Sequence, residues 1–220
     1  GFSQALLQIP FGFLSDRYGR KRIIYLGLLI FALGSVVAAM ADSIGGVILG
    51  RALQGGGAVS AAVMALAADL TREEHRTKVM ATIGITIGLS FAASMILGPV
   101  LNGGIGVSGI FWLTALLALL GIVVVRFRVP DPVESRIHRD AEPVAAQFGR
   151  VLNNEPLLRL NFGIFILHLL LTATFVAVPL ALRDAGLTSS QHWQVYLPAL
   201  TLSMAAMIPF IILAERRRQL

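Results

Sequence analysis

Apolar residues fall into seven long runs that are separated by short charged segments. The runs cover residues 1–15, 23–41, 44–68, 79–101, 105–125, 160–182 and 193–214. A helix of about 20 apolar residues crosses the hydrocarbon core of a bilayer, and most of the runs reach that length. They lack the period of two that a membrane β-barrel requires, as residues 116–125 illustrate. The pattern therefore predicts an all-α integral membrane protein with seven helices in this chain.

The composition supports a location in the membrane. Hydrophobic residues make up 56% of the 220 residues, charged residues only 14%, and the mean hydropathy is +0.78. A soluble domain carries roughly 25% charged residues, so this composition excludes a soluble enzyme, a coiled coil and a disordered chain. The chain has no cysteine, which excludes a disulfide scaffold and a thiolate metal site.

The first run is predicted to be the second half of a spanning helix. Residues 1–15 carry no charge, begin without a methionine and end abruptly at Asp16. A signal peptide is not expected here, because no basic segment precedes the apolar run. We therefore expect the chain to be part of a longer protein.

Lysine and arginine lie almost entirely on one side of the predicted helices. Sixteen of the eighteen lie on the side that holds loops 16–22, 69–78 and 127–156 and the C-terminal tail. The other side holds only Arg183, and Arg51 lies within a run. Because basic residues mark the cytoplasmic side, these three loops are predicted to be cytoplasmic. The isoelectric point near 10.7 thus reflects membrane orientation, and no nucleic-acid partner is expected.

The segment 127–156 differs from the other loops in its length. It has about thirty residues, four of which are proline, and it is rich in charge. Residues 145–152 show partial helical patterning. We expect a cytoplasmic linker that lies along the membrane and joins two helix bundles.

A short internal repeat also divides the chain. Residues 9–17 and 208–216 are identical at five of nine positions, at an offset of 199. A chance match between apolar segments is the alternative to two related halves of about six helices, as in transporters built from parallel repeats. We predict an N-terminal bundle at 1–126, the linker at 127–156, and the start of a second bundle at 157–220.

Residues 12–21 combine glycine, an acid and several cations in the string GFLSDRYGRK. An ordinary cytoplasmic loop accounts for the basic residues but not for the acid among them. The string resembles the loop between the second and third helices of major facilitator superfamily transporters, G-x-L-x-D-R-x-G-R-[KR]. In that family the loop is a charge latch between the two halves. The resemblance implies a cytoplasmic gate formed by Gly12, Asp16, Arg17, Gly19, Arg20 and Lys21.

The resemblance extends over the whole chain, whose runs and linker follow the order of helices two to eight of the family. It implies a major facilitator fold of two six-helix bundles in a bacterial inner membrane. The branch that it most resembles is that of proton-driven drug exporters. Asp69 and Arg76 resemble positions that join the cytoplasmic charge network, whereas a merely solvated loop is the alternative for 69–78.

The run 44–68 contains a charge within the membrane. Arg51 lies seven residues into the run, about 10 Å deep at 1.5 Å per residue, and Gln54 lies one turn further on. The alternative interpretation is an arginine whose head reaches the lipid headgroups. The pattern resembles the family motif R-x-x-Q-G-x-[GA], which implies proton coupling by Arg51 and Gln54. Because no acid lies within the predicted spans, the partner carboxylate is expected outside this chain.

The run 79–101 ends in a Gly-Pro pair that predicts a kink. Gly-Pro pairs are common in membrane helices, so the pair alone indicates little. Its surroundings resemble the antiporter motif of drug exporters, G-x-x-x-G-P-x-x-G-G, with Ser94 and Asn102 in place of two glycines. The resemblance implies an antiporter-type kink at Ser94, Gly98, Pro99 and Gly103.

Polar and aromatic residues share one face of the run 160–182, because they recur at spacings of three and four. We interpret this face as the wall of a substrate cavity, in which histidine can change charge near neutral pH. A histidine buried and hydrogen-bonded within the bundle is the alternative. A smaller polar stripe on the first run is interpreted in the same way. The predicted cavity residues are Gln4, Gln8, Asn161, Phe165, His168, Thr172 and Phe175.

These features predict a secondary transporter that exports hydrophobic or amphipathic compounds in exchange for protons, by alternating access. We expect no enzymatic activity, no metal site and no cofactor, with the proton gradient as the energy source. The expected partners are a small-molecule substrate, protons and the lipid bilayer, and the expected state is a monomer. The alternatives are proton-coupled uptake of a sugar or organic anion by the same fold, and a membrane scaffold that transports nothing.

Overall fold

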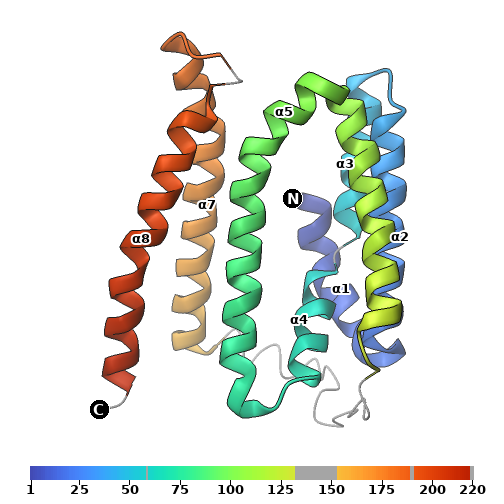
Figure 1. Ribbon diagram of the computed structural model, residues 1–220. Coiled ribbons are helices and arrows are strands. Elements are labelled where there is room, and N and C mark those ends of the chain that lie inside the picture. Colours follow the sequence, from blue (N-terminus) through green and yellow to red (C-terminus); the bar gives the residue numbers. More distant parts are fainter. Residues whose placement is uncertain (58, 132–152, 189–190, 219–220) are drawn as a thin grey trace. The chain divides into compact units, whose positions relative to one another are not determined.

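The computed structural model describes the chain except residues 58, 132–152, 189–190 and 219–220 (Figure 1). The described residues form helices and contain no strand, which confirms the all-α class. The helices in order are α1 (Phe2–Tyr18), α2 (Arg20–Ala39), α3 (Ile44–Gly56), α4 (Ser60–Asp69), α5 (Glu73–Arg128), α7 (Glu155–Asp184) and α8 (Trp193–Arg218).

Four helical stretches in the described part of the chain are long and apolar enough to cross a membrane. They are Arg20–Ala39, Ile44–Asp69, Glu73–Arg128 and Glu155–Asp184. The second of these combines α3 with α4, and the third has 56 residues, which is enough for two of the predicted runs. The helix α1 has only 17 residues, fewer than the roughly 20 that a full span needs.

The run 44–68 is not one continuous helix, and the prediction of a single helix there was wrong. The helix α3 ends at Gly56, and α4 begins at Ser60. At Gly57 the backbone leaves the helix with φ −78° and ψ 46°, while its N–H donates to the Gln54 carbonyl at 3.1 Å. Three consecutive glycines at 55–57 favour this break, because glycine disfavours a helix interior by about 1 kcal/mol relative to alanine.

The helix α5 consists of two helices that meet at Gly106. This glycine has φ 69° and ψ 177°, a conformation that side chains bearing a Cβ rarely adopt. The predicted runs 79–101 and 105–125 therefore join at a single glycine instead of a short loop. The backbone stays helical through Pro99, so the kink expected there remains a prediction.

The helices group into two compact units. One unit contains residues 1–87 and 101–143, and the other contains residues 88–100 and 144–220. The middle of α5 thus groups with the C-terminal helices. The bundle boundaries expected from the sequence, at residues 126 and 157, remain predictions, and the patterned linker segment 145–152 lies outside the described residues.

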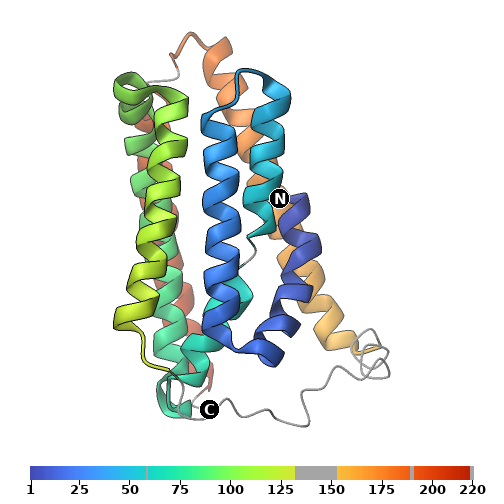
Figure 2. The same cartoon turned by 90° about the vertical axis from the view of Figure 1, so that its right-hand side faces the viewer.

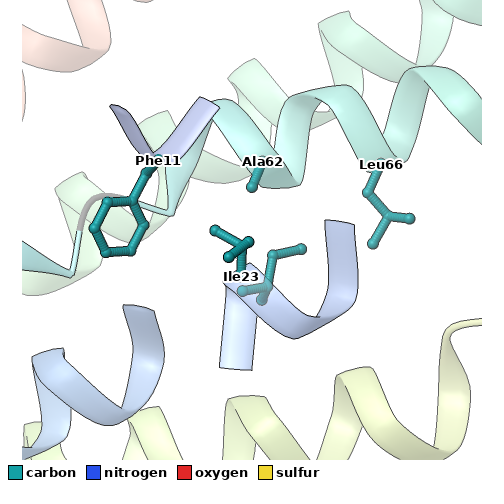
Figure 3. Close-up of a cluster of buried hydrophobic side chains, with 5 residues drawn as sticks. Phe11, Ile23, Ala62 and Leu66 are labelled. Carbon is teal, nitrogen blue, oxygen red and sulfur yellow. The ribbon is translucent and has the colours of Figure 1, made fainter. Parts of the chain in front are cut away.

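The first unit has a small apolar core where α1, α2 and α4 meet. Phe11, Ile23, Ile24, Ala62 and Leu66 are each at most 6% exposed and pack together (Figure 3). These side chains come from the cytoplasmic ends predicted for their helices. The core therefore fixes the end of α1 against α2 and α4, where the predicted gate residues lie.

The helices α2 and α3 lie side by side with their backbones in close contact (Figures 1 and 2). A Cβ built on Gly34 would lie 2.7 Å from the carbonyl oxygen of Gly50, and one on Gly50 would lie 2.5 Å from the nitrogen of Ala38. A Cβ on Gly57 would collide with the carbonyl oxygen of Gly27. Small residues thus allow a close approach that leaves little room for adjustment.

We expect Gly34→Ala to lower the thermal unfolding midpoint of the complete, detergent-solubilised protein by several degrees. The added methyl group would meet backbone atoms of α3, and overpacking typically costs about 1–3 kcal/mol. Gly84→Ala is the matched control, because a Cβ there meets nothing within 4 Å. Equal unfolding midpoints for the two variants would contradict the close packing of α2 on α3.

Candidate functional site

A tight turn between α1 and α2 places Arg20 beside the end of α1. The turn consists of Gly19, which separates Tyr18, the last residue of α1, from Arg20, the first of α2. Gly19 has φ 96° and ψ 136°. A residue with a Cβ is strained at this φ, which explains why glycine occupies the position.

Arg20 is the centre of a charge network that joins three helices. Its guanidinium forms an ion pair with Asp16 of α1, and its Nε donates to Asp69 Oδ2 of α4 at 3.0 Å. The Nη1 atom also donates to the Ser15 hydroxyl at 2.8 Å, and this hydroxyl donates to the Gly12 carbonyl at 2.7 Å. One cation therefore holds two carboxylates that would otherwise repel each other.

Exposure limits the strength of each single bond in this network. The side chain of Arg20 is 22% exposed, and those of Asp16 and Asp69 are 43% and 36% exposed. Exposed ion pairs contribute about 0–1 kcal/mol each because water and salt screen them. Ser15, by contrast, is only 1% exposed, so the network includes one buried hydroxyl group. Such an arrangement suits a latch that must also open.

Lys21 forms a second ion pair at this end of the unit. Its Nζ lies 2.9 Å from Oδ1 of Asp131, a residue of the segment that follows α5. The hydrogen bond and the charge of Lys21 lower the pKa of the exposed Asp131 carboxyl group below its ordinary value. This carboxylate stays ionised at neutral pH, and its pairing is lost only as the pH falls through the lowered pKa.

Arg17 of the predicted gate and Arg76 of the predicted charge network lie outside the Arg20 network. Arg17 is exposed and lies over the ring of Tyr18, 5.7 Å from its centroid. Arg76 pairs with Glu73 at 3.7 Å. A Cβ on Gly12 would meet nothing within 4 Å, so no described helix packs closely against this position.

The guanidinium of Arg51 has a neutral partner on its own helix. Its Nη1 donates to Gln54 Oε1 at 2.9 Å, which confirms that both side chains share one face of α3. Gln54 is 4% exposed, and its Nε2 donates to the Ser35 hydroxyl of α2 at 2.5 Å. Arg51 itself is exposed, and no described carboxylate forms an ion pair with it.

The smaller polar stripe on α1 reaches α4. The Gln8 side chain donates through Nε2 to the Ser60 hydroxyl at 2.9 Å, and Gln4 is exposed one turn earlier.

The predicted antiporter residues make fewer contacts. Ser94 donates to the Ser90 carbonyl of its own helix at 2.7 Å, and a Cβ on Gly98 or Gly103 would meet nothing within 4 Å.

The stripe on α7 ends in an aromatic cluster of the second unit. Asn161, Phe165, His168 and Thr172 are all exposed. His168 Nδ1 lies 3.0 Å from the Ile164 carbonyl oxygen. Among the described residues His168 bonds only within its own helix, and its role in a cavity remains a prediction. Phe175 is half-buried between Phe91, in an edge-on contact at 5.2 Å, and Tyr196, stacked at 5.8 Å.

The family model of the Major Facilitator Superfamily matches residues 1–220, the entire chain. The chain belongs to the Major Facilitator Superfamily. This membership confirms the fold class implied by the string at 12–21. It also agrees with a membrane protein whose chain crosses the bilayer several times.

Three curated relatives place the chain within the superfamily. It is 50% identical, over all of its 220 residues, to the inner membrane transport protein YajR of Escherichia coli, of which it covers 48%. It is 37% identical over 127 residues to a triacylglyceride transporter of Mycobacteroides abscessus, covering 53% of this chain and 23% of the relative. It is 30% identical over 128 residues to multidrug resistance protein 3 of Bacillus subtilis, covering 57% of this chain and 25% of the relative. The chain thus spans about half the length of YajR.

Several polar residues of this superfamily chain were missed by the sequence interpretation. They are Ser15, Ser35, Ser60, Asp131 and Tyr196. Ser35 had a usable signal, because it and Tyr25 are the only polar side chains in the apolar run 23–41. A lone hydroxyl surrounded by glycine and alanine in a spanning helix indicates a bond across a helix contact.

Proposed function

We propose that the complete protein is a secondary exporter in a bacterial inner membrane, which exchanges protons for hydrophobic or amphipathic compounds by alternating access. In this proposal the Arg20 network is the cytoplasmic latch, and Arg51 with Gln54 couples transport to proton movement. The loops 16–22, 69–78 and 127–156 face the cytoplasm, where the basic residues gather.

The observation that carries proton coupling is the charge of Arg51 on an apolar helix, which no carboxylate in the described part of the chain compensates. A charge within a membrane span costs at least about 2.5 kcal/mol on insertion scales, and such residues are typically functional. The neutral amide of Gln54 orients the guanidinium but does not cancel its charge. A carboxylate near Arg51 would bind its proton less tightly, so protonation and the position of this carboxylate would be linked.

The proposed substrate class rests on the names of two relatives and on the predicted cavity face of α7. One relative is named as a transporter of triacylglycerides, which are hydrophobic, and another is named for multidrug resistance. The predicted cavity face of α7 carries the aromatic rings of Phe165 and Phe175 together with the polar side chains of Asn161, His168 and Thr172. Residues 161–175 include no lysine or arginine that would pair with an organic anion, and the two aromatic rings offer apolar contact area.

The test uses the complete protein in proteoliposomes that contain a pH-sensitive dye. Ethidium is the probe, because its permanent charge prevents it from carrying protons by itself. For an antiporter, external ethidium should raise the internal pH, since inward ethidium movement drives protons out. A fall in internal pH would indicate proton-coupled uptake in the same direction. An unchanged pH for ethidium and for an uncharged lipophilic dye, with folded protein present, would contradict proton exchange with such compounds.

A further inference from the structure

The hydroxyl of Ser35 fixes the orientation of the Gln54 amide. This hydroxyl has one proton, which it donates to the Phe31 carbonyl of its own helix at 2.9 Å. Toward Gln54 it can therefore only accept a hydrogen bond, so the amide must turn its NH2 group to Ser35, at 2.5 Å. The amide oxygen is then directed to the other side, where Arg51 Nη1 donates to it at 2.9 Å.

Burial makes this orientation costly to change. Ser35 is 0% exposed and Gln54 is 4% exposed, so water does not replace a lost partner of either group. The two helices also cannot separate easily, because Gly34 and Gly50 bring their backbones into contact beside the pair. Ser35 and Gln54 are thus held at a fixed separation by the packing of α2 on α3.

We propose that Ser35 is a positioning residue for Arg51, acting through Gln54. This inference rests on the proposed coupling role of Arg51. Without the Ser35 hydroxyl, the amide of Gln54 is free to rotate and present its NH2 group to the guanidinium. Two donors then face each other, and Arg51 loses its fixed position. Ser35 itself touches neither proton nor substrate.

A purely structural role makes a different prediction. If Ser35 only fills the space between α2 and α3, then alanine fills it nearly as well, and the hydroxyl bond to Phe31 contributes little. Loss of the hydroxyl would then leave the bond between Gln54 and Arg51 unchanged. The two roles are separated by whether the effects of Ser35 and Gln54 depend on each other.

The transport test compares Ser35→Ala, Gln54→Leu and the double variant of the complete protein, with ethidium-driven proton flux as the readout. Each single variant should lose about tenfold, the effect of one hydrogen bond to a charged group, and the double variant should lose no more than Gln54→Leu alone. Thr114→Ala is the control, because its hydroxyl donates only to the Ile110 carbonyl of its own helix, at 2.7 Å. Flux in Ser35→Ala equal to that of the control, or strictly multiplied losses in the double variant, would overturn the proposal.

A stability cycle tests the same inference without transport. With Ser35 in place, Arg51→Ala should change the unfolding midpoint by different amounts in the presence and in the absence of Gln54→Leu. In the Ser35→Ala background the two changes should be equal. If the effect of Arg51→Ala still depends on Gln54 in the Ser35→Ala background, the positioning role of Ser35 is overturned. This result does not require proton transport, so it distinguishes failure of the positioning role from failure of the proposed proton coupling. If Ser35→Ala does not reach the membrane, Ser35→Cys keeps the volume with a much weaker hydrogen-bonding group. Wild-type coupling between Arg51 and Gln54 in that variant would also overturn it.

Discussion

Arg20→Ala in the complete protein is expected to reduce ethidium transport about tenfold or more, with little change in the amount of protein in the membrane. The substitution removes the cation that pairs with both Asp16 and Asp69, and no other described cation forms an ion pair with either carboxylate. A bias of about 1–2 kcal/mol, typical of coupling energies, changes the ratio of two conformations by roughly 5- to 30-fold. The transporter would then rest in one state.

Asp16→Asn should have a smaller effect in the same assay. It removes one carboxylate, but the bond between Arg20 and Asp69 at 3.0 Å remains. Arg76→Ala is the matched control, because Arg76 pairs with the exposed Glu73 outside this network. If Arg20→Ala at normal membrane levels transports as fast as Arg76→Ala, then the loop serves only to orient the chain in the membrane.

Patterns that act within one helix could be predicted from the sequence. The lengths of the apolar runs were sufficient for the all-α class, because a bilayer demands helices of that length. The spacing of Arg51 and Gln54 also predicted their shared face, since residues three apart are neighbours on a helix. Even within one run, however, the break after Gly56 was missed, because membrane helices tolerate glycine and nothing in the hydropathy of 44–68 marks an end.

Contacts between helices could not be predicted in this way. Arg20 and Asp69 are 49 residues apart, and Ser35 and Gln54 are 19 residues apart, so their meeting depends on how the helices rotate and slide against each other. For α2 and α3 this arrangement follows from the backbone contact of Gly34 with Gly50, which depends on the shape of the helices and not on hydropathy. The family motif includes Arg20, but it does not predict the hydrogen bond from Arg20 to the buried Ser15 hydroxyl.

Arg51→Ala and Arg51→Lys are both expected to reduce ethidium-driven proton flux by roughly 10- to 100-fold, the range for losing one charge-assisted hydrogen bond. Lysine keeps the charge but lacks the planar guanidinium group of arginine. Arg51 can donate one N–H to Gln54 Oε1 while its other N–H groups remain available for the proposed carboxylate. The lysine variant should therefore resemble the alanine variant. Arg183, exposed near the end of α7, provides the control Arg183→Ala.

The same two Arg51 variants separate coupling from binding. Equilibrium binding of ethidium to the detergent-solubilised protein should fall much less than the proton flux, because Gln54 and Arg51 are proposed to act on the proton and not on the substrate. Equal losses of binding and flux would assign Arg51 to the substrate cavity instead. Proton flux at the level of Arg183→Ala in both variants would favour an arginine that reaches the lipid headgroups, because a charge solvated by headgroups has no reason to govern a proton inside the bundle.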